Sequence, residues 1–240
     1  MDSSTDKLTE ASASPRPERD SWLCLIPISA TAFYYLLPSD WQALRLIQFF
    51  PQVLAYAALG WWLVRNNSAA TRLGLLPLTL WTEGFHWGFR IGLALGFINV
   101  SVILWIVPWL GQDIAFLRET PHAQIPLFIM VPWFIALIAF FVEVNFRGFL
   151  LGRLLSCFIQ VLPHASRPTP HVLAVGLSAL AFSFDPFMVI TFRHLHWIAV
   201  WDGIVWGLLW LRLRNLYAPI VAHAVEVIVM YSIIRTVMIS

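Results

Sequence analysis

The stretch PLFIMVPWFIALIAFFVEVNFRGFLLGRLLSCFIQVL, residues 126–162, decides the class of this protein. It is much longer than the roughly 20 apolar residues that cross a bilayer, and it carries Glu143, Asn145 and Arg147 inside the apolar run. Lipid offers no hydrogen-bond partner to an open backbone group, so a run of this kind must be helical. The stretch therefore predicts a membrane helix with an ionisable centre.

The composition of the whole chain agrees with this prediction. Hydrophobic residues make up 59% of the 240 residues and charged residues 12%, with a net charge of +2. A soluble domain averages about 45–50% apolar and about 25% charged residues. This excludes an ordinary soluble protein, a disordered chain and a nucleic-acid binder with a basic face. Cys24 and Cys157 are too few and too isolated for a disulfide framework or a cysteine-based metal site.

The chain divides into three parts by polarity. Residues 1–20 are polar and predict a disordered tail, residues 21–124 predict N-terminal membrane helices, and residues 125–240 form a core that carries most intramembrane polar groups. We predict an all-α polytopic membrane bundle of about seven transmembrane helices, with an amphipathic interfacial helix over Leu73–Arg90. The expected spans cover residues 22–37, 44–64, 91–110, 126–162, 172–196, 197–211 and 216–239.

Ionisable side chains inside membrane helices are costly, so each is a hypothesis for a functional site. The first three spans carry almost none in their middles, which directs attention to the second half of the chain. The candidates there are Glu143, Arg147, Asp202, His223 and Glu226, with His194 and His196 at a helix junction.

Glu143 and Arg147 are four residues apart, so they share a helix face and are expected to pair. This pair is open to a structural interpretation, in which it only makes the helix tolerable in lipid. Gly148 and Gly152 add a face of small residues that allows close helix contact.

His196 and His223 belong to two other expected helices. A carboxylate and two neutral imidazoles can hold and activate a water molecule, which suits hydrolysis of an amide bond. The same residue types suit a proton-coupled transporter equally well, although no internal repeat is visible.

Three motifs carry a family resemblance. VEVNFRGFLL (142–151), FRHLH (192–196) and AHAVEV (222–227) resemble the EExxxR, FxxxH and HxxxN motifs of the CPBP family. These are the CAAX-processing and bacteriocin-processing (Abi-type) intramembrane endopeptidases. The stretches 202–207 and 214–223 also resemble the segment before the last motif of the family, so the resemblance covers about residues 125–235.

The resemblance implies a glutamic-type CAAX endopeptidase that cuts near the C-terminus of a membrane-anchored or lipidated protein. Glu143 would position or activate the attacking water, Arg147 would orient Glu143, and His196 and His223 would hold the water and stabilise the oxyanion. It implies a location in the bacterial inner membrane, with the lipid bilayer and a protein or peptide substrate as partners. We expect no tightly bound metal, although two histidines and a glutamate are also a zinc ligand set.

This sequence departs from the family pattern at the first and third motifs. Val142 replaces the first glutamate of EExxxR, and Val227 replaces the asparagine of HxxxN, a useful oxyanion donor. Glu226 is expected either to supply the missing carboxylate or to pair with Arg235 or Arg212. A catalytically impaired membrane partner or chaperone with the same fold is therefore the second hypothesis.

The second motif has two candidates. We prefer Phe192 to His196, with His194 as the alternative histidine, but FSFDP (182–186) can also be an altered copy of this motif. Asn145 and Asp202 are expected to support the site. A single glutamate in the first motif and a histidine followed by tryptophan resemble the members found beside bacterial exosortase systems.

Overall fold

The computed structural model describes residues 18–75, 81–166 and 168–239, and these parts of the chain are helical without any strand. The all-α prediction is therefore confirmed for them. Of the tail expected over residues 1–20, residues 1–17 lie outside the described residues. Glu18, Arg19 and Asp20 are described and bind the helices, so the tail prediction does not hold for these three residues.

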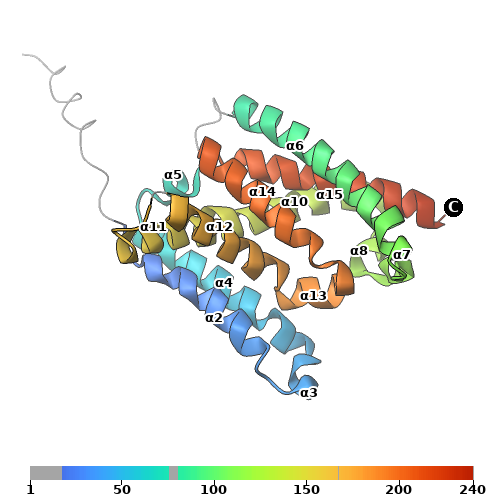
Figure 1. Ribbon diagram of the computed structural model, residues 1–240, viewed down its shortest axis with the longest axis horizontal. Coiled ribbons are helices and arrows are strands. Elements are labelled where there is room, and N and C mark those ends of the chain that lie inside the picture. The colour runs from blue at the N-terminus through green and yellow to red at the C-terminus, as the bar shows by residue number, and fades with distance from the viewer. Residues whose placement is uncertain (1–17, 76–80, 167, 240) are drawn as a thin grey trace, which may run out of the picture.

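The N-terminal elements form one side of the bundle, where α2 and α4 lie side by side (Figure 1). They are η2 (Ser21–Cys24), α2 (Leu25–Tyr34), α3 (Ser39–Gln42), α4 (Arg45–Arg65) and α5 (Ala69–Leu73). Gly74 follows α5 with a φ of 87°, a left-handed conformation that only glycine adopts without strain. Its carbonyl accepts a hydrogen bond from the backbone of Leu216, which joins the two halves of the chain.

Two long helices follow, and each contains π-helical turns. The first consists of α6 (Trp81–Ser101), η4 (Val102–Ile106) and α7 (Val107–Trp109), and two short elements come after it, η5 (Ala115–Glu119) and α8 (Pro121–Gln124). The second consists of α9 (Leu127–Ile129), η6 (Met130–Phe134), α10 (Ile135–Glu143), η7 (Val144–Leu151) and α11 (Gly152–Val161). The π-helical turns are rare in proteins and are frequent at functional sites. One of these segments, η7, begins directly after Glu143.

The C-terminal part completes the bundle around these two helices. It comprises α12 (Pro168–Ser183), α13 (Pro186–Phe192), η8 (Arg193–Leu195), α14 (Ile198–Leu213) and α15 (Tyr217–Ile239). Pro186 starts α13 after a break, because its ring and missing N–H cannot continue α12.

Among the described residues, four helices are long and apolar enough to cross a membrane: Arg45–Arg65, Thr82–Trp109, Ile135–Val161 and Tyr217–Met238. The pair Pro168–Ser183 and Pro186–Leu195, bent by 55°, would be a fifth span. The expected count of about seven is not confirmed, because α2 and α14 have only 10 and 16 residues. By the length and composition of its helices, the chain is a membrane protein.

The interfacial helix expected over Leu73–Arg90 is not a separate element. Instead, α6 begins at Trp81 and continues through Arg90 into the apolar part of the same helix; residues 76–80 lie outside the described residues. The reason is close packing between α6 and α15, which lie side by side in Figure 1. A Cβ atom on Gly88 would lie 2.5 Å from the carbonyl oxygen of Ala218, so only glycine permits this contact.

The main hydrophobic core joins α4, η7 and α14. The ring centroids of Trp62 and Phe149 lie 5.7 Å apart, and Trp210 donates a hydrogen bond from Nε1 to the carbonyl of Leu73 at 2.9 Å. Gly148 and Gly152 form the close-contact face expected from the sequence, because a Cβ atom on either would lie 3.0–3.3 Å from Leu73 or Trp210. This packing holds η7 in the middle of the bundle.

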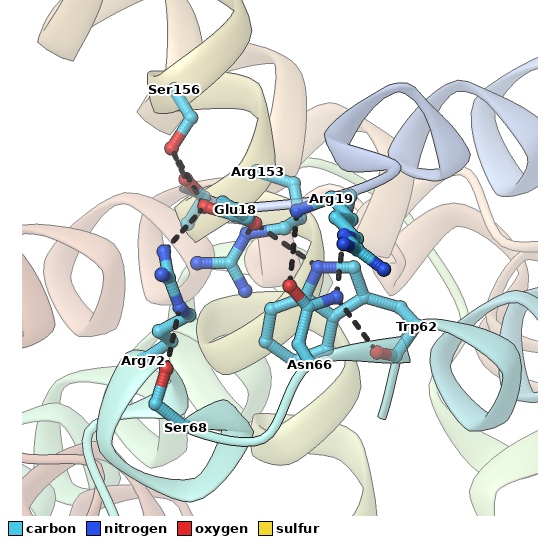
Figure 2. Close-up of polar contacts among 9 residues, drawn as sticks. Glu18, Arg19, Trp62, Asn66, Ser68, Arg72, Arg153 and Ser156 are labelled. Carbon is cyan, nitrogen blue, oxygen red and sulfur yellow. Dashed lines mark hydrogen bonds and ion pairs between the residues drawn. The ribbon is translucent and has the colours of Figure 1, made fainter. Parts of the chain in front are cut away.

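A group of polar side chains anchors the start of the described chain (Figure 2). The Glu18 carboxylate forms ion pairs with Arg153 and, at 3.4 Å, with Arg72. It also accepts hydrogen bonds from Trp62 Nε1 at 3.1 Å and from Ser156 Oγ at 3.5 Å. We call these five residues the Glu18 cluster; it ties the N-terminal segment to α4, α5 and α11.

Candidate functional site

The site is built around Glu143, the last residue of α10, whose exposed fraction is 0%. Its Oε1 accepts a hydrogen bond from Arg147 Nη1 at 3.2 Å and lies 2.8 Å from His223 Nδ1. The pair expected from the four-residue spacing is therefore present, and a third helix, α15, joins it. We call Glu143, Arg147 and His223 the Glu143 site.

Arg147 is enclosed by aromatic rings as well as by Glu143. Its guanidinium carbon lies 4.6 Å from the centroid of the Phe182 ring and 4.9 Å from that of Trp206. The negative faces of these rings stabilise a cation that water cannot reach. One carboxylate and two rings therefore surround the buried Arg147 cation, which is 1% exposed, while its Nε and Nη2 have no hydrogen-bond partner among the described residues.

His223 has its ring orientation determined by two contacts. It stacks on Trp206 with a centroid distance of 4.4 Å and an interplanar angle of 16°, while its Nδ1 edge faces Glu143. When Glu143 is ionised it can only accept, so Nδ1 carries a proton, and in a neutral ring Nε2 is then left with a lone pair. The carboxylate thus selects the imidazole tautomer.

A cavity of about 470 Å³ adjoins the Glu143 site. His223 lines it, whereas Glu143 and Arg147 lie behind the lining. Val142 and Val227, the two departures from the family motifs, both line the same cavity. The lining is mainly apolar, and its acidic, basic, imidazole or amide side chains are Gln52, Arg118, His122, Asn145, Asp185, Asp202, His223, Glu226 and Arg235.

Two further carboxyl groups reach this cavity together. Asn99 Nδ2, from α6, donates to Asp202 Oδ1 at 3.1 Å and to Glu226 Oε1 at 2.7 Å. Trp201 Nε1 donates to Asn99 Oδ1 at 2.9 Å, which points the amide nitrogen at the carboxyl groups. The second Glu226 oxygen, Oε2, is buried and has no hydrogen-bond partner in the described structure.

The alternative partners expected for Glu226 bind elsewhere. Arg235 Nη1 donates to the carbonyls of Ala123 and Ile125, both at 3.2 Å. Arg212 lies over the ring of Trp87 at 6.0 Å. Glu226 instead faces Asn99 and the cavity, which agrees with the other sequence interpretation, a second carboxylate at the site.

The two histidines expected from the second motif do not join the Glu143 site. His196 Nδ1 lies 2.6 Å from the carbonyl of Arg193, and its ring contacts Phe184. The ring of His194 packs edge-on against Phe116. Neither histidine lines the cavity. The reason is a sharp local turn, in which Arg193 has a φ of 47° and the following residues form η8 rather than a continuous helix.

The other candidate for the second motif does face the cavity. Phe182 and Asp185, from FSFDP, both line it. Asp185 Oδ1 accepts hydrogen bonds from the Phe187 backbone at 3.0 Å and from Gln52 Nε2 at 2.8 Å. This carboxylate therefore has clear structural partners at the break between α12 and α13.

Asn145 was expected to support the site, and its buried Oδ1 has no partner among the described residues. Trp206 and His122 were not expected there, and both line the cavity. Burial lowers the pKa of His122, which lies in the short helix α8. The sequence pointed to His122 only through its place in the polar loop before the long helix that begins at Leu127.

A metal site is not assembled in the described part of the chain. No group of three or more histidine, cysteine, aspartate or glutamate side chains there has an arrangement that could hold a metal ion. His223 and Glu143 do meet, but the third zinc ligand considered from the sequence, His196, does not reach them.

No family model, curated protein or solved structure matches this chain. The resemblance to the CPBP family therefore stays a prediction that rests on the three sequence motifs.

Proposed function

We propose that this protein is an intramembrane endopeptidase of the glutamic type. It hydrolyses a peptide bond near the C-terminus of a membrane-anchored or lipidated protein. The observation that carries the proposal is the contact between Glu143 and His223, 2.8 Å long and buried, with His223 at the wall of a cavity inside a membrane bundle. The sequence motifs around both residues point to the same chemistry.

In this mechanism Glu143 acts through His223. The ionised carboxylate holds the Nδ1 proton, so Nε2 is available to hydrogen-bond the attacking water. Arg147 balances the charge of Glu143 and keeps its carboxylate aimed at the imidazole. Because Glu143 does not line the cavity, it is a positioning residue in this scheme.

The cavity supports the substrate class. A mainly apolar lining with a few polar groups suits an apolar peptide segment or a lipid chain, with the polar groups orienting the reacting bond. The location in the bacterial inner membrane, and the relation to exosortase-associated proteins, rest on the sequence resemblance alone.

The test uses purified protein in liposomes and a panel of internally quenched peptides. The panel contains peptides that end in a lipidated cysteine, the same peptides without lipid, and single-span membrane peptides. We expect the wild type to cleave a lipidated or membrane-spanning member, and Glu143→Gln and His223→Ala to lose about 10²–10⁴-fold in rate. His196→Ala is the matched control and retains activity, because its ring binds its own loop.

Two results contradict the proposal. One is the absence of wild-type cleavage across the panel. The other is normal cleavage by both Glu143→Gln and His223→Ala while size-exclusion profiles stay unchanged.

A second candidate function is a membrane partner or chaperone without proteolysis. The observation that favours it is the presence of Val142 and Val227 in the cavity wall, at the positions where the family carries a carboxylate and an amide. This function predicts that the wild type and Glu143→Gln bind the single-span peptides equally, and that neither cleaves them.

A further inference from the structure

We propose that Asp202 and Glu226 form a catalytic carboxyl pair, which activates the attacking water and protonates the scissile carbonyl. This inference rests on the proposed function and deepens it. It assigns the proton transfers to Asp202, which lies outside the three motifs, and to Glu226, which lies within the third motif but not at its histidine or asparagine position. Asn99 and Trp201 are the residues that position them.

The first argument is geometric. Asn99 Nδ2 lies within hydrogen-bonding distance of both carboxyl groups, so α6 holds an acidic residue of α14 beside one of α15. Both carboxyl groups line the cavity, whereas Asn99 does not. The amide therefore supports the pair from the side that is away from the cavity.

The second argument is the unsatisfied oxygen of Glu226. This side chain is 2% exposed, and its Oε2 has no partner among the described residues. A buried polar atom without a partner costs about 1–3 kcal/mol in a structural role. The Asp202 and Glu226 side chains also hydrogen-bond to each other, which two ionised carboxylates cannot do, so a proton shared between them supplies the missing donor.

The third argument is the balance of charge. The ionisable groups that face the pair are Glu143 and Arg147 from the α10–η7 helix and His223 from α15. Arg147 is already paired with Glu143. Two more ionised carboxyl groups would then lie together without a counterion, which a buried site does not tolerate. Asp202 and Glu226 are therefore expected to share one proton, as adjacent carboxyl groups do.

His223 and Glu226 are also arranged to meet one water molecule. They are three residues apart on α15 and share a helix face. Both line the cavity, so a water bound to His223 Nε2 would lie at the same wall as the Glu226 side chain. Glu226 on α15 thereby takes the place of the glutamate that the EExxxR motif has where this chain has Val142.

The reaction then balances as follows. The Glu226 carboxylate removes one proton from water while the water oxygen bonds to the carbonyl carbon of the scissile amide. The Asp202 carboxyl group gives its proton to the carbonyl oxygen, which forms a neutral gem-diol. Asp202 next takes a proton back from one hydroxyl as the C=O bond re-forms and the C–N bond breaks. Glu226 gives its proton to the leaving amine, so the products are an acid and an amine and the pair regains its first state.

The activity test compares three isosteric variants on a peptide of the panel that the wild type cleaves. We expect Asp202→Asn and Glu226→Gln each to lower the rate about 10²–10⁴-fold, as expected when a general acid or base is lost. Glu18→Gln is the matched control, a carboxylate with arginine partners outside the cavity, and it keeps near wild-type activity. Thermal denaturation in detergent must show folded protein for all three. Normal cleavage by either Asp202→Asn or Glu226→Gln overturns the pair.

A second measurement needs no substrate. Infrared difference spectra of the protein in liposomes are expected to contain a protonated carboxyl band near neutral pH, and this band is absent in the Asp202→Asn, Glu226→Gln double variant. An unchanged band in the double variant overturns the shared proton. The two proposals fail separately, because normal cleavage by both Glu143→Gln and His223→Ala contradicts the proposed function. Loss of activity in Glu143→Gln alone, with active Asp202→Asn and Glu226→Gln, contradicts only the carboxyl pair.

Discussion

The Glu18 cluster and the Glu143 site are both built from a carboxylate and arginine side chains, yet they differ in whether both carboxylate oxygens have partners. Both Glu18 oxygens have partners, Arg153 and Trp62 on one and Arg72 and Ser156 on the other (Figure 2). In the Glu143 site, Oε1 accepts from Arg147 and meets His223, while Oε2 has no partner among the described residues.

The two sites also differ in whether they adjoin the cavity. None of the five residues of the Glu18 cluster lines the cavity, whereas His223 does. The Glu18 carboxyl joins the N-terminal segment to three helices, so its satisfied contacts explain it as a structural anchor. In contrast, the Glu143 site combines deep burial, a carboxylate oxygen without a partner among the described residues and an adjoining cavity. Arg153 Nη1 in the Glu18 cluster also has no partner among the described residues, so the two sites differ in their carboxylates and in the adjoining cavity rather than in their arginines.

The largest expected effect comes from removing Arg147. Arg147→Met leaves Glu143 buried beside His223 without its cation, which costs about 3–5 kcal/mol for a broken buried pair. Thermal denaturation of the purified protein in detergent measures this loss. The double variant Glu143→Gln, Arg147→Met should be more stable than Arg147→Met alone, because it removes the uncompensated charge. Equal stability of the two variants would show that the charge of Glu143 is balanced by other groups.

A smaller effect is expected in the Glu18 cluster. Glu18→Ala leaves Arg72 and Arg153 without their shared carboxylate, but water reaches this region, since the Arg72 side chain is 21% exposed. The expected loss is about 1–3 kcal/mol, with no change in the rate of peptide cleavage. Glu18→Gln, which retains acceptor capacity, should lose less. A drop in cleavage rate without a drop in stability would mean that the Glu18 cluster is more than an anchor.

The smallest effect is expected for Asp20→Asn. The Arg65–Asp20 pair lies at 3.3 Å with side chains that are 48% and 27% exposed, so water screens it and its contribution is about 0–1 kcal/mol. Asp20 has a φ of 58°, and asparagine accepts this left-handed conformation, so the backbone is not disturbed. Thermal denaturation should give a midpoint close to that of the wild type. A shift as large as that of Glu18→Ala would assign part of the anchoring to Asp20.

Local patterns predicted part of the site. The spacing of Glu143 and Arg147 gave their contact, because four residues separate neighbours on one helix face. Glu226 was expected as a replacement carboxylate from its distance of three residues from His223. The histidines of the second motif lie away from Glu143, because the residues of FRHLH are folded into a tight turn that the spacing of phenylalanine and histidine does not reveal.

Asn99 shows why the other contacts of the site could not be predicted from the sequence. It is a single asparagine in an apolar helix, and its contact with Glu226 spans 127 residues of sequence. A signal was present in Gly84, Gly88, Gly92 and Gly96, spaced four apart on α6. This spacing indicates a close helix neighbour but does not say that the neighbour is α15.

The sequence by itself determined the class of this protein, since 59% hydrophobic residues and long apolar runs leave a helical membrane bundle as the stable form. It also determined the Glu143–Arg147 pair, which depends only on helix geometry. Only the tertiary structure decided which histidine reaches Glu143, and which amide holds Asp202 beside Glu226. Those contacts depend on how α6, α14 and α15 pack, and packing follows from the shapes of whole helices rather than from any one motif.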